Sequence, residues 1–260
     1  MLKNKNALVT GSTSGIGLGI ARELASKGAN IVLNGFGMKS EIENLRTNIE
    51  SDFSVKAIYL NADLSKANEI ESFFNSAESK LGTIDILVNN AGIQHTDSIE
   101  TFPVEKWDLI IALNLSAVFH LSRLALPAMK EKNWGRIINI ASVHGMVAST
   151  QKAAYVAAKH GVIGLSKVIA LECAETQITC NAICPGWVLT PLVEKQIAAL
   201  AQEKKLSLKE ASDLLLSEKQ PSKRFTGISE LAELASFLCS NAAANITGAS
   251  LPVDGGWTAR

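Results

Sequence analysis

The chain has 260 residues, of which 47% are hydrophobic and 19% are charged, and its 25 Lys and Arg side chains balance 25 Asp and Glu side chains. This balance predicts a folded globular protein with a sizeable core and excludes a largely disordered chain. Because the basic residues are scattered and the formal net charge is zero, no concentrated basic surface is available for a nucleic-acid partner.

Neither the amino terminus nor the apolar runs predict export or membrane insertion. The apolar stretch near the start ends at Gly11, too soon for a signal-peptide core, and no uninterrupted run approaches the roughly 18 apolar residues of a membrane span. The four cysteines form no CxxC pair, and neither they nor the four histidines have metal-site spacing. We therefore expect a cytoplasmic protein with free thiols, no bound metal and no membrane partner.

Short β-branched runs alternate with helical patterns along almost the whole chain. The runs that predict strands are Ala7–Thr10, Ile31–Leu33, Val55–Leu60, Ile84–Val88, Arg136–Ala141, Thr179–Ile183 and Ser250–Val253. The patterns that predict helices are Gly17–Lys27, Ser40–Ser51, Ala67–Lys80, Val104–Lys132, Ala153–Thr176 and Glu230–Ser240. Most strand runs are continuously apolar, as in parallel strands that are covered on both faces. The alternation predicts an α/β fold, a doubly wound, seven-stranded parallel Rossmann sheet with helices on both faces, formed by a single domain over residues 1–260.

One segment, residues 190–222, interrupts this alternation. It contains no strand candidate and only two short amphipathic helical patterns, Leu192–Gln202 and Leu208–Ser217. It follows the sixth predicted strand, at the edge where the ligand crevice of a doubly wound sheet opens. We expect a helical substrate lid, and the alternative is an insertion without a functional role.

A glycine-rich turn joins the first predicted strand to the first predicted helix, with the sequence Thr10-Gly11-Ser12-Thr13-Ser14-Gly15-Ile16-Gly17. Glycines in this position let the chain turn tightly and bring backbone N–H groups close to a pyrophosphate at the helix amino terminus. A glycine turn without a ligand is the alternative, but the place between strand and helix favours a dinucleotide site. The spacing is Gly-x3-Gly-x-Gly rather than Gly-x-Gly-x2-Gly.

Further motifs follow this turn in order along the chain. They are Asp63 after the third strand, Asn89-Asn90-Ala91-Gly92 after the fourth, Asn114, Ser142, Tyr155-x3-Lys159, and Pro185-Gly186 with Thr190. Together with the glycine spacing they resemble the short-chain dehydrogenase/reductase family over nearly the whole chain. The resemblance implies hydride transfer at a carbonyl carbon with a nicotinamide dinucleotide. It also implies that Asp63 reads the adenine edge, that Asn90 supports the central strand and the cofactor, and that Thr190 holds the nicotinamide carboxamide.

The cofactor-binding set expected from the turn and the resemblance comprises Gly11, Thr13, Ser14, Gly15, Ile16, Gly17, Phe36, Ala62, Asp63, Leu64, Asn90, Gly92, Tyr155, Lys159, Pro185, Gly186, Val188 and Thr190. In this family an acidic residue after the second strand often binds the adenosine ribose, whereas a basic residue there accepts a 2′-phosphate. Here the strand ends in Asn34-Gly35-Phe36, and the glycine turn contains no Lys or Arg. A phosphate without a cationic partner is costly to desolvate, so NAD is favoured over NADP, with Lys39 as the residue that could reverse this preference.

Tyr155 and Lys159 lie one helical turn apart, so their side chains share a face. A phenol with a pKa near 10 is a poor base at neutral pH, but an adjacent ammonium favours the phenolate and makes Tyr155 a usable acid or base. Tyr-x3-Lys alone is better explained as a half-exposed helix face, whereas the glycine turn and Ser142 at the end of the fifth strand favour catalysis. The resemblance implies four catalytic roles. Tyr155 transfers the proton, and Lys159 adjusts the pKa of Tyr155 and binds the ribose. Ser142 orients the reacting oxygen, and Asn114 relays protons through a water.

Several polar and aromatic side chains surround this predicted core. Together with Ser142 and Tyr155, the expected substrate residues are Gln94, His144, Lys152, Trp187, Gln196 and Trp257. They form a cationic, hydrogen-bonding pocket with aromatic walls, which suits a small carboxylate. Taken singly, the lysine and the glutamines are equally explained as surface residues and the tryptophans as core.

Four stretches narrow the expected substrate. Ser142–Gly145, Gln151–Lys152, Trp187–Gln196 and Asp254–Trp257 look closely like those members of the family that interconvert the ketone-body acids (R)-3-hydroxybutyrate and acetoacetate. This similarity, which includes the lid length, implies a small hydroxy or keto acid as substrate, NAD as cofactor and a homotetramer.

Two alternatives stay open. A 3-oxoacyl-carrier-protein reductase of the same family would need a basic docking surface and an open cleft, and Lys152 and the long lid argue against it. A non-catalytic NAD-binding sensor should have lost Tyr155 or Lys159, and both are present.

Overall fold

Seven parallel strands form the central sheet of the computed structural model, which describes residues 1–259 apart from the side chain of Leu192. Their order is β3-β2-β1-β4-β5-β6-β7, so the order reverses between β1 and β4. The bounds are β1 Asn6–Val9, β2 Asn30–Leu33, β3 Ala57–Tyr59, β4 Ile86–Asn89, β5 Gly135–Ile140, β6 Ile178–Pro185 and β7 Ser250–Val253. A doubly wound sheet opens its ligand crevice at such a reversal, beyond the carboxyl ends of the strands.

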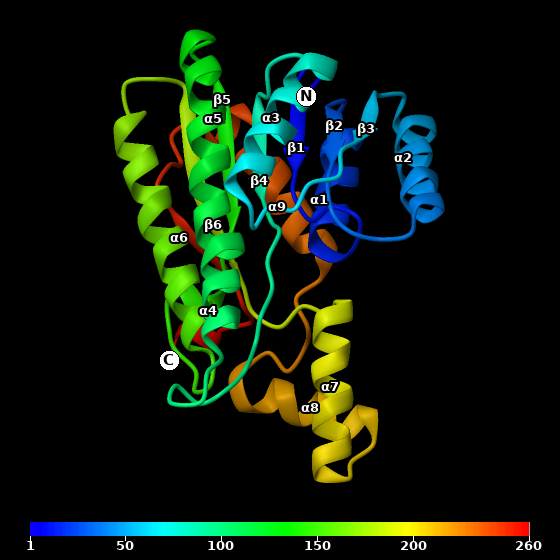
Figure 1. Cartoon of the computed structure of the whole chain (residues 1–260), viewed down its shortest axis with the longest axis vertical. Helices are drawn as coiled ribbons and strands as arrows, with labels where there is room; N and C mark the ends of the chain where they lie inside the picture. The colour runs from blue at the N-terminus through cyan, green and yellow to red at the C-terminus, as the bar shows by residue number, and fades with distance from the viewer. Residues whose placement is uncertain (260) are drawn as a thin grey trace.

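Helices cover both faces of the sheet, which confirms the predicted fold class (Figure 1). On one face α1 packs along α9 and α2 packs against β3, and on the other face α3 packs along α5 and α6 packs against β6. The bounds are α1 Gly15–Ser26, α2 Lys39–Phe53, α3 Ala67–Leu81, α4 Val104–Ile111, α5 Ala117–Glu131, α6 Ala153–Glu172, α7 Pro191–Lys204, α8 Leu208–Lys219 and α9 Ile228–Leu238.

The two apolar layers explain why the strand sequences are continuously apolar. In β1, Ala7 and Val9 belong to the layer under α1 and α9, whereas Leu8 belongs to the layer under α3 and α5. Every residue of β5 and β6 is buried. Successive side chains of a strand point to opposite faces, so a strand covered on both sides is mostly apolar.

The predicted helix 104–132 is one long helical segment with a π-helical turn, Ala112–Ser116 (η1), between α4 and α5. The sequence predicts the helix but not this turn, because i→i+5 hydrogen bonding leaves no signature in the apolar pattern. Asn114 lies in the turn and is 0% exposed. Such turns occur mostly at functional sites.

The helical segments Val104–Glu131 and Ala153–Glu172 are long and apolar enough to cross a membrane by length and composition alone. Neither contains a long uninterrupted apolar run, because polar residues are interspersed. In the structure both pack on one face of the sheet, and each keeps large exposed apolar side chains on its outer side. The most exposed of these are Val104, Trp107, Phe119, Val168 and Leu171.

The helices α7 and α8 form a pair that projects from the rest of the molecule beyond the carboxyl edge of the sheet (Figure 1). The predicted helical patterns in residues 190–222 therefore correspond to real helices, and a capping box between Ser207 and Glu210 begins the second one. The pair has its own apolar cluster around Val193, Ile197 and Ala211, against which Trp187 packs from the main body.

Candidate active site

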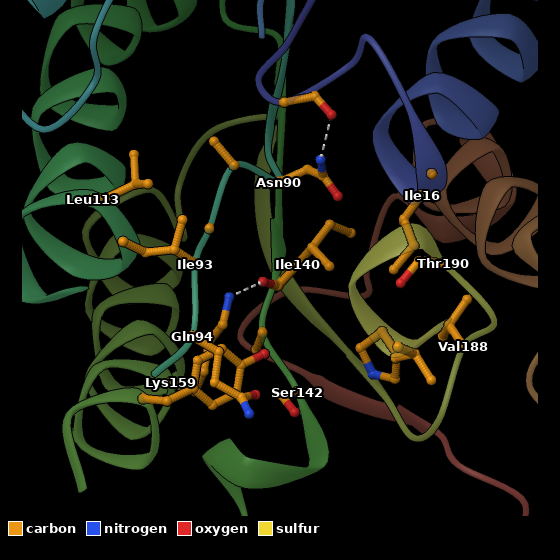
Figure 2. A pocket seen from close by; sticks show the side chains of 18 of the residues that line it. Ile16, Asn90, Ile93, Gln94, Leu113, Ile140, Ser142, Lys159, Val188 and Thr190 are labelled. Carbon is orange, nitrogen blue, oxygen red and sulfur yellow. Dashed lines mark hydrogen bonds between the residues drawn. The ribbon is translucent and has the colours of Figure 1, made fainter. Parts of the chain in front are cut away.

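A cavity of about 430 Å³ lies beyond the carboxyl ends of the strands and beneath the start of α7. Figure 2 shows side chains from the turns after β1, β4, β5 and β6, and from α6, pointing into one space. The strand-following segments that line it are Gly11 with Thr13–Ile16, Asn34–Phe36, Ala62–Leu64, Asn90–Gln94, Ile140–His144 and Pro185–Val188. The sheet thus brings together segments that are distant in the sequence.

All of the predicted site residues line this cavity except Gly17 and Asn114. Gly17 is buried in α1, and Asn114 is buried behind Ile93. The structure adds lining residues outside the predicted site set, namely Asn34, Gly35, Ala91, Ile93, Leu113, Ile140, Ala141, Val143, Pro191 and Val193. Most are apolar or contribute backbone, so their residue types alone do not indicate a role in the site.

The glycine turn is shaped for close approach of a ligand to the backbone. Gly11 and Gly15 have φ of 60° and 55°, a conformation that favours glycine. A Cβ on Gly17 would lie 2.3 Å from the carbonyl oxygen of Gly11, so the third glycine lets the helix pack against the turn. Asn90 Nδ2 donates to the Gly11 carbonyl at 3.1 Å, which holds the turn from the end of β4 (Figure 2). This cradle fits the pyrophosphate of a dinucleotide.

The far end of the cavity from the catalytic residues fits an adenosine. Asp63 Oδ1 accepts hydrogen bonds from the backbone N–H and hydroxyl of Ser65, and these bonds hold the pKa of Asp63 below its ordinary value. Phe36 is 74% exposed, and its carbonyl accepts from the Thr13 hydroxyl at 2.8 Å. Among the described residues that line this end, none is cationic, and Lys39 at the start of α2 lies outside the lining.

Tyr155 and Lys159 both face the cavity from α6, but the pKa of Tyr155 shifts in the opposite direction from the prediction. Lys159 Nζ donates to the Ile140 carbonyl at 2.6 Å and lies 5.6 Å from the centre of the Tyr155 ring (Figure 2). Burial lowers the pKa of Lys159 to about 8 and raises the pKa of Tyr155, which the interaction with Ser142 only partly offsets. The expectation that the ammonium lowers the phenol pKa is therefore wrong for this state, because burial dominates.

Ser142 lies directly after β5 with its hydroxyl beside Tyr155. Its Oγ accepts a hydrogen bond from the His144 N–H at 3.1 Å, which fixes the short turn Val143–Gly145 (η2). The hydroxyl hydrogen remains able to contact an oxygen in the cavity.

The Asn114 side chain holds the loop after β4. Its Oδ1 accepts from the Ile93 N–H at 2.9 Å and its Nδ2 donates to the Ile93 carbonyl at 2.8 Å. The amide is therefore engaged with the backbone that leads into Gln94, and the relay role of Asn114 stays a prediction.

An aromatic and cationic group closes the substrate end. Lys152 Nζ lies 5.1 Å from the centre of the Trp187 ring, within cation–π range, and Trp257 packs at 5.8 Å from Trp187 and 5.4 Å from His144. Gln94 and Gln196 line the same cavity. The substrate residues expected from the sequence therefore lie together.

The two ionisable side chains at this end, His144 and Lys152, differ in charge at neutral pH. Burial, followed by the charge of Lys152, lowers the pKa of His144 to about 3, and the ring contacts the Ser149 hydroxyl at 2.9 Å. His144 is therefore neutral, because a buried imidazolium beside a lysine is too costly. Burial and the charge of Lys219 lower the pKa of Lys152 to about 8, which leaves it protonated at neutral pH.

This arrangement can transfer a proton to or from an oxygen atom. A phenol and a hydroxyl converge on one point, a buried ammonium lies behind them, and a second cation lies beside the aromatic wall. When bound, a nicotinamide dinucleotide supplies or takes up the hydride that completes such a reaction. Over the described residues, no cluster of three or more His, Cys, Asp or Glu side chains has the geometry of a metal site.

Comparison with known proteins places this geometry in a family. Residues 5–201 match the model of the short chain dehydrogenases. The chain is 57% identical to D-beta-hydroxybutyrate dehydrogenase of Cupriavidus necator over 100% of both chains, and 52% identical to that of Rhizobium meliloti over 98% of this chain and 99% of the relative. The solved actinorhodin polyketide ketoreductase with NADPH is 35% identical, with a TM-score of 0.91 over 99% of each chain. The chain therefore belongs to the short-chain dehydrogenase family.

Proposed function

We propose that this enzyme oxidises (R)-3-hydroxybutyrate to acetoacetate, and catalyses the reverse reduction, with NAD as the hydride carrier. The observation that carries the proposal is Lys152, a cation against the Trp187 ring at the end of a cavity that also presents Tyr155 and Ser142. The full-length similarity to two dehydrogenases named for beta-hydroxybutyrate supports the same substrate.

In the proposed oxidation, Tyr155 accepts the proton of the substrate hydroxyl while the hydrogen on the same carbon leaves as a hydride. In the reduction, Tyr155 returns the proton to the forming alkoxide, and the raised pKa of its buried phenol suits this donation. Ser142 donates to the reacting oxygen and keeps it beside the phenol. Lys159 Nζ lies 5.6 Å from the centre of the Tyr155 ring and holds a positive charge near the developing phenolate.

The carboxylate of the substrate pairs with Lys152 in this proposal. A charge-assisted hydrogen bond in a buried pocket is among the stronger polar contacts, and neutral His144, Gln94 and Gln196 add hydrogen bonds without a competing charge. A 3-oxoacyl-carrier-protein substrate has a thioester here instead, which would leave the Lys152 ammonium without a counter-charge.

NAD rather than NADP is the proposed cofactor. Phe36 and the glycine turn offer no cation for a 2′-phosphate, and Lys39 lies outside the cavity lining. The ratio of kcat/KM for NAD and NADP measures this preference, and we expect at least about a tenfold advantage for NAD.

We also propose a single Rossmann-type domain over residues 1–260, of which Arg260 lies outside the described residues, with residues 190–222 as the lid. The enzyme would act in the cytoplasm as a homotetramer. The exposed apolar side chains on the outer faces of α4–α5 and α6 support burial against further copies of the chain.

The test is an NADH absorbance assay with NAD and a panel of (R)- and (S)-3-hydroxybutyrate, sugar alcohols and acyl thioesters. We expect kcat/KM to be highest with (R)-3-hydroxybutyrate. A higher value with a 3-hydroxyacyl thioester would replace the proposal by the acyl-carrier-protein alternative, and NADH binding without turnover of any substrate would favour the sensor.

A further inference from the structure

The backbone N–H and the carbonyl of Trp187 both form hydrogen bonds with the segment that follows α8. Gln220 Oε1 accepts from the Trp187 N–H at 2.9 Å, and the Trp187 carbonyl accepts from the Thr226 N–H at 2.8 Å. The indole N–H is buried and has no acceptor within the described part of the chain. The position of the ring therefore depends on these backbone bonds and on packing, not on a bond of its own side chain.

Gln220 is fixed more firmly than most side chains at a helix end. It is 1% exposed, and its Nε2 donates to the Arg224 carbonyl, so both ends of the amide have partners. A Cβ on Gly186 would lie 2.7 Å from Gln220 Oε1, and one on Gly255 would lie 2.8 Å from its Cγ. Gln220 is thus a packed junction of three segments: the turn after β6, the end of α8 and the turn after β7.

Trp187 connects this junction to the substrate end of the cavity. Its ring lies 5.1 Å from Lys152 Nζ and 5.8 Å from the Trp257 ring, and it packs against the apolar cluster of α7 and α8. A shift of the Trp187 backbone would therefore move the aromatic wall and remove the cation–π partner of Lys152. Gln220 itself is absent from the described lining of the cavity, so it acts through the residues that it contacts, and its hydrogen bond to the Trp187 N–H links it to the substrate end.

We propose that Gln220 is a positioning residue that sets substrate affinity by tying Trp187, and with it the Lys152 end of the cavity, to the base of the α7–α8 pair. The inference rests on the proposed function only in taking this end as the site of the substrate carboxylate. Because these contacts hold the non-reacting end of the substrate, they contribute equally to binding in the ground state and in the transition state. Their loss should appear in KM rather than in kcat.

Gln220→Leu keeps the volume and removes both hydrogen bonds. We expect the KM for 3-hydroxybutyrate to rise about tenfold, with kcat and the Kd of NADH within about twofold of the wild type. Gln220→Glu keeps an oxygen for the Trp187 N–H, so its KM should rise only about threefold. The matched control is Gln202→Leu, at an exposed position on α7, which should leave all three constants unchanged.

Hydrogen exchange at the Trp187 amide gives a second readout that needs no substrate. Exchange should be at least about tenfold faster in Gln220→Leu than in the wild type, and slower in Gln220→Glu than in Gln220→Leu. If the wild type does not oxidise 3-hydroxybutyrate, the proposed function fails. The hydrogen exchange rate of the Trp187 amide still tests whether Gln220 holds the Trp187 backbone. Unchanged KM and exchange in Gln220→Leu, or an equal loss in kcat and in NADH affinity, would overturn the inference. If Gln220→Leu does not fold, a wild-type KM in Gln220→Glu would overturn it instead.

Discussion

Tyr155 is the residue on which the proton transfer depends. Tyr155→Phe removes the phenolic proton and leaves the ring that packs beside His144, whose centroid lies 6.0 Å away. We expect kcat to fall by about a hundred- to ten-thousandfold, the usual contribution of general acid–base catalysis, with the Kd of NADH almost unchanged. Steady-state kinetics and fluorescence titration with NADH measure the two quantities. A variant that keeps more than about a tenth of the wild-type kcat would show that another group transfers the proton.

Lys152 is expected to decide the preference for acids. Lys152→Ala should lower kcat/KM for acetoacetate by about ten- to a hundredfold, because the carboxylate loses a charge-assisted contact. A neutral 3-oxobutyrate ester should lose far less, and His144→Ala should affect acid and ester alike because its ring is neutral. An equal loss on acid and ester in Lys152→Ala would mean that the lysine supports structure instead.

The lowered pKa of Lys152 also predicts a pH dependence. Burial and Lys219 bring this pKa to about 8, so the ammonium is present below that pH and is lost as pH rises through it. The KM for acetoacetate should therefore be lowest below about pH 8 and should rise by up to about tenfold per pH unit above it. Lys159 has a similar pKa but acts on both acetoacetate and the ester. The KM of the ester therefore shows the effect of Lys159 alone, and the additional rise for acetoacetate shows the effect of Lys152. Parallel profiles for acid and ester would contradict the role of Lys152.

The same residues show how far sequence reasoning reaches. The pair Tyr155 and Lys159 could be found because both carry chemistry at a recognisable spacing. The direction of the phenol pKa shift could not be predicted, because it depends on how deeply the side chain is buried. Gln220 belongs to no recognisable sequence pattern, and its proposed role depends on the contact of three segments that are distant in the sequence.

At the scale of elements, the α7–α8 pair should respond to ligands. Its apolar cluster is small and largely its own, and it lines the cavity through Pro191, Val193 and Gln196, next to Thr190. We expect hydrogen exchange over Pro191–Ser217 to slow when NAD and substrate are both present, because bound ligands add contacts that the free pair lacks. The glycine turn serves as an internal reference for cofactor binding alone. Equal protection of the pair with and without ligands would make it a structural insertion.

The element boundaries show a second limit of the sequence. Most predicted strands and helices overlap the observed ones within a few residues, since apolar runs and turn glycines mark them directly. β4 begins at Ile86 rather than Ile84, and the Asp85 carboxylate just before it accepts from the Asn6 N–H at 3.0 Å and pairs with Lys132. A side-chain bond of this kind is invisible in an apolar pattern.

At the scale of the whole molecule, we expect a tetramer that is held in part by the outer faces of α4–α5 and α6. Leu171 is 78% exposed on α6, so Leu171→Glu should place a charge in the proposed interface and shift the assembly to smaller species. Sedimentation velocity measures this, with Lys209→Glu on α8 as the control that should not change the assembly. A wild-type monomer at micromolar concentration would contradict the proposed quaternary structure.

The π-helical turn at Ala112–Ser116 divides one long helix into two halves with different neighbours. Ile110 in the first half packs with Ala154 of α6, near Ile93 and Phe102 of the segment that follows β4, whereas Leu121 in the second half packs in the main core. An extra residue in the turn offsets the two faces, so each half keeps its own packing register. Substitutions in α4 can therefore change its packing against α6 while α5 keeps its register in the main core, so one continuous helix carries two independently packed segments.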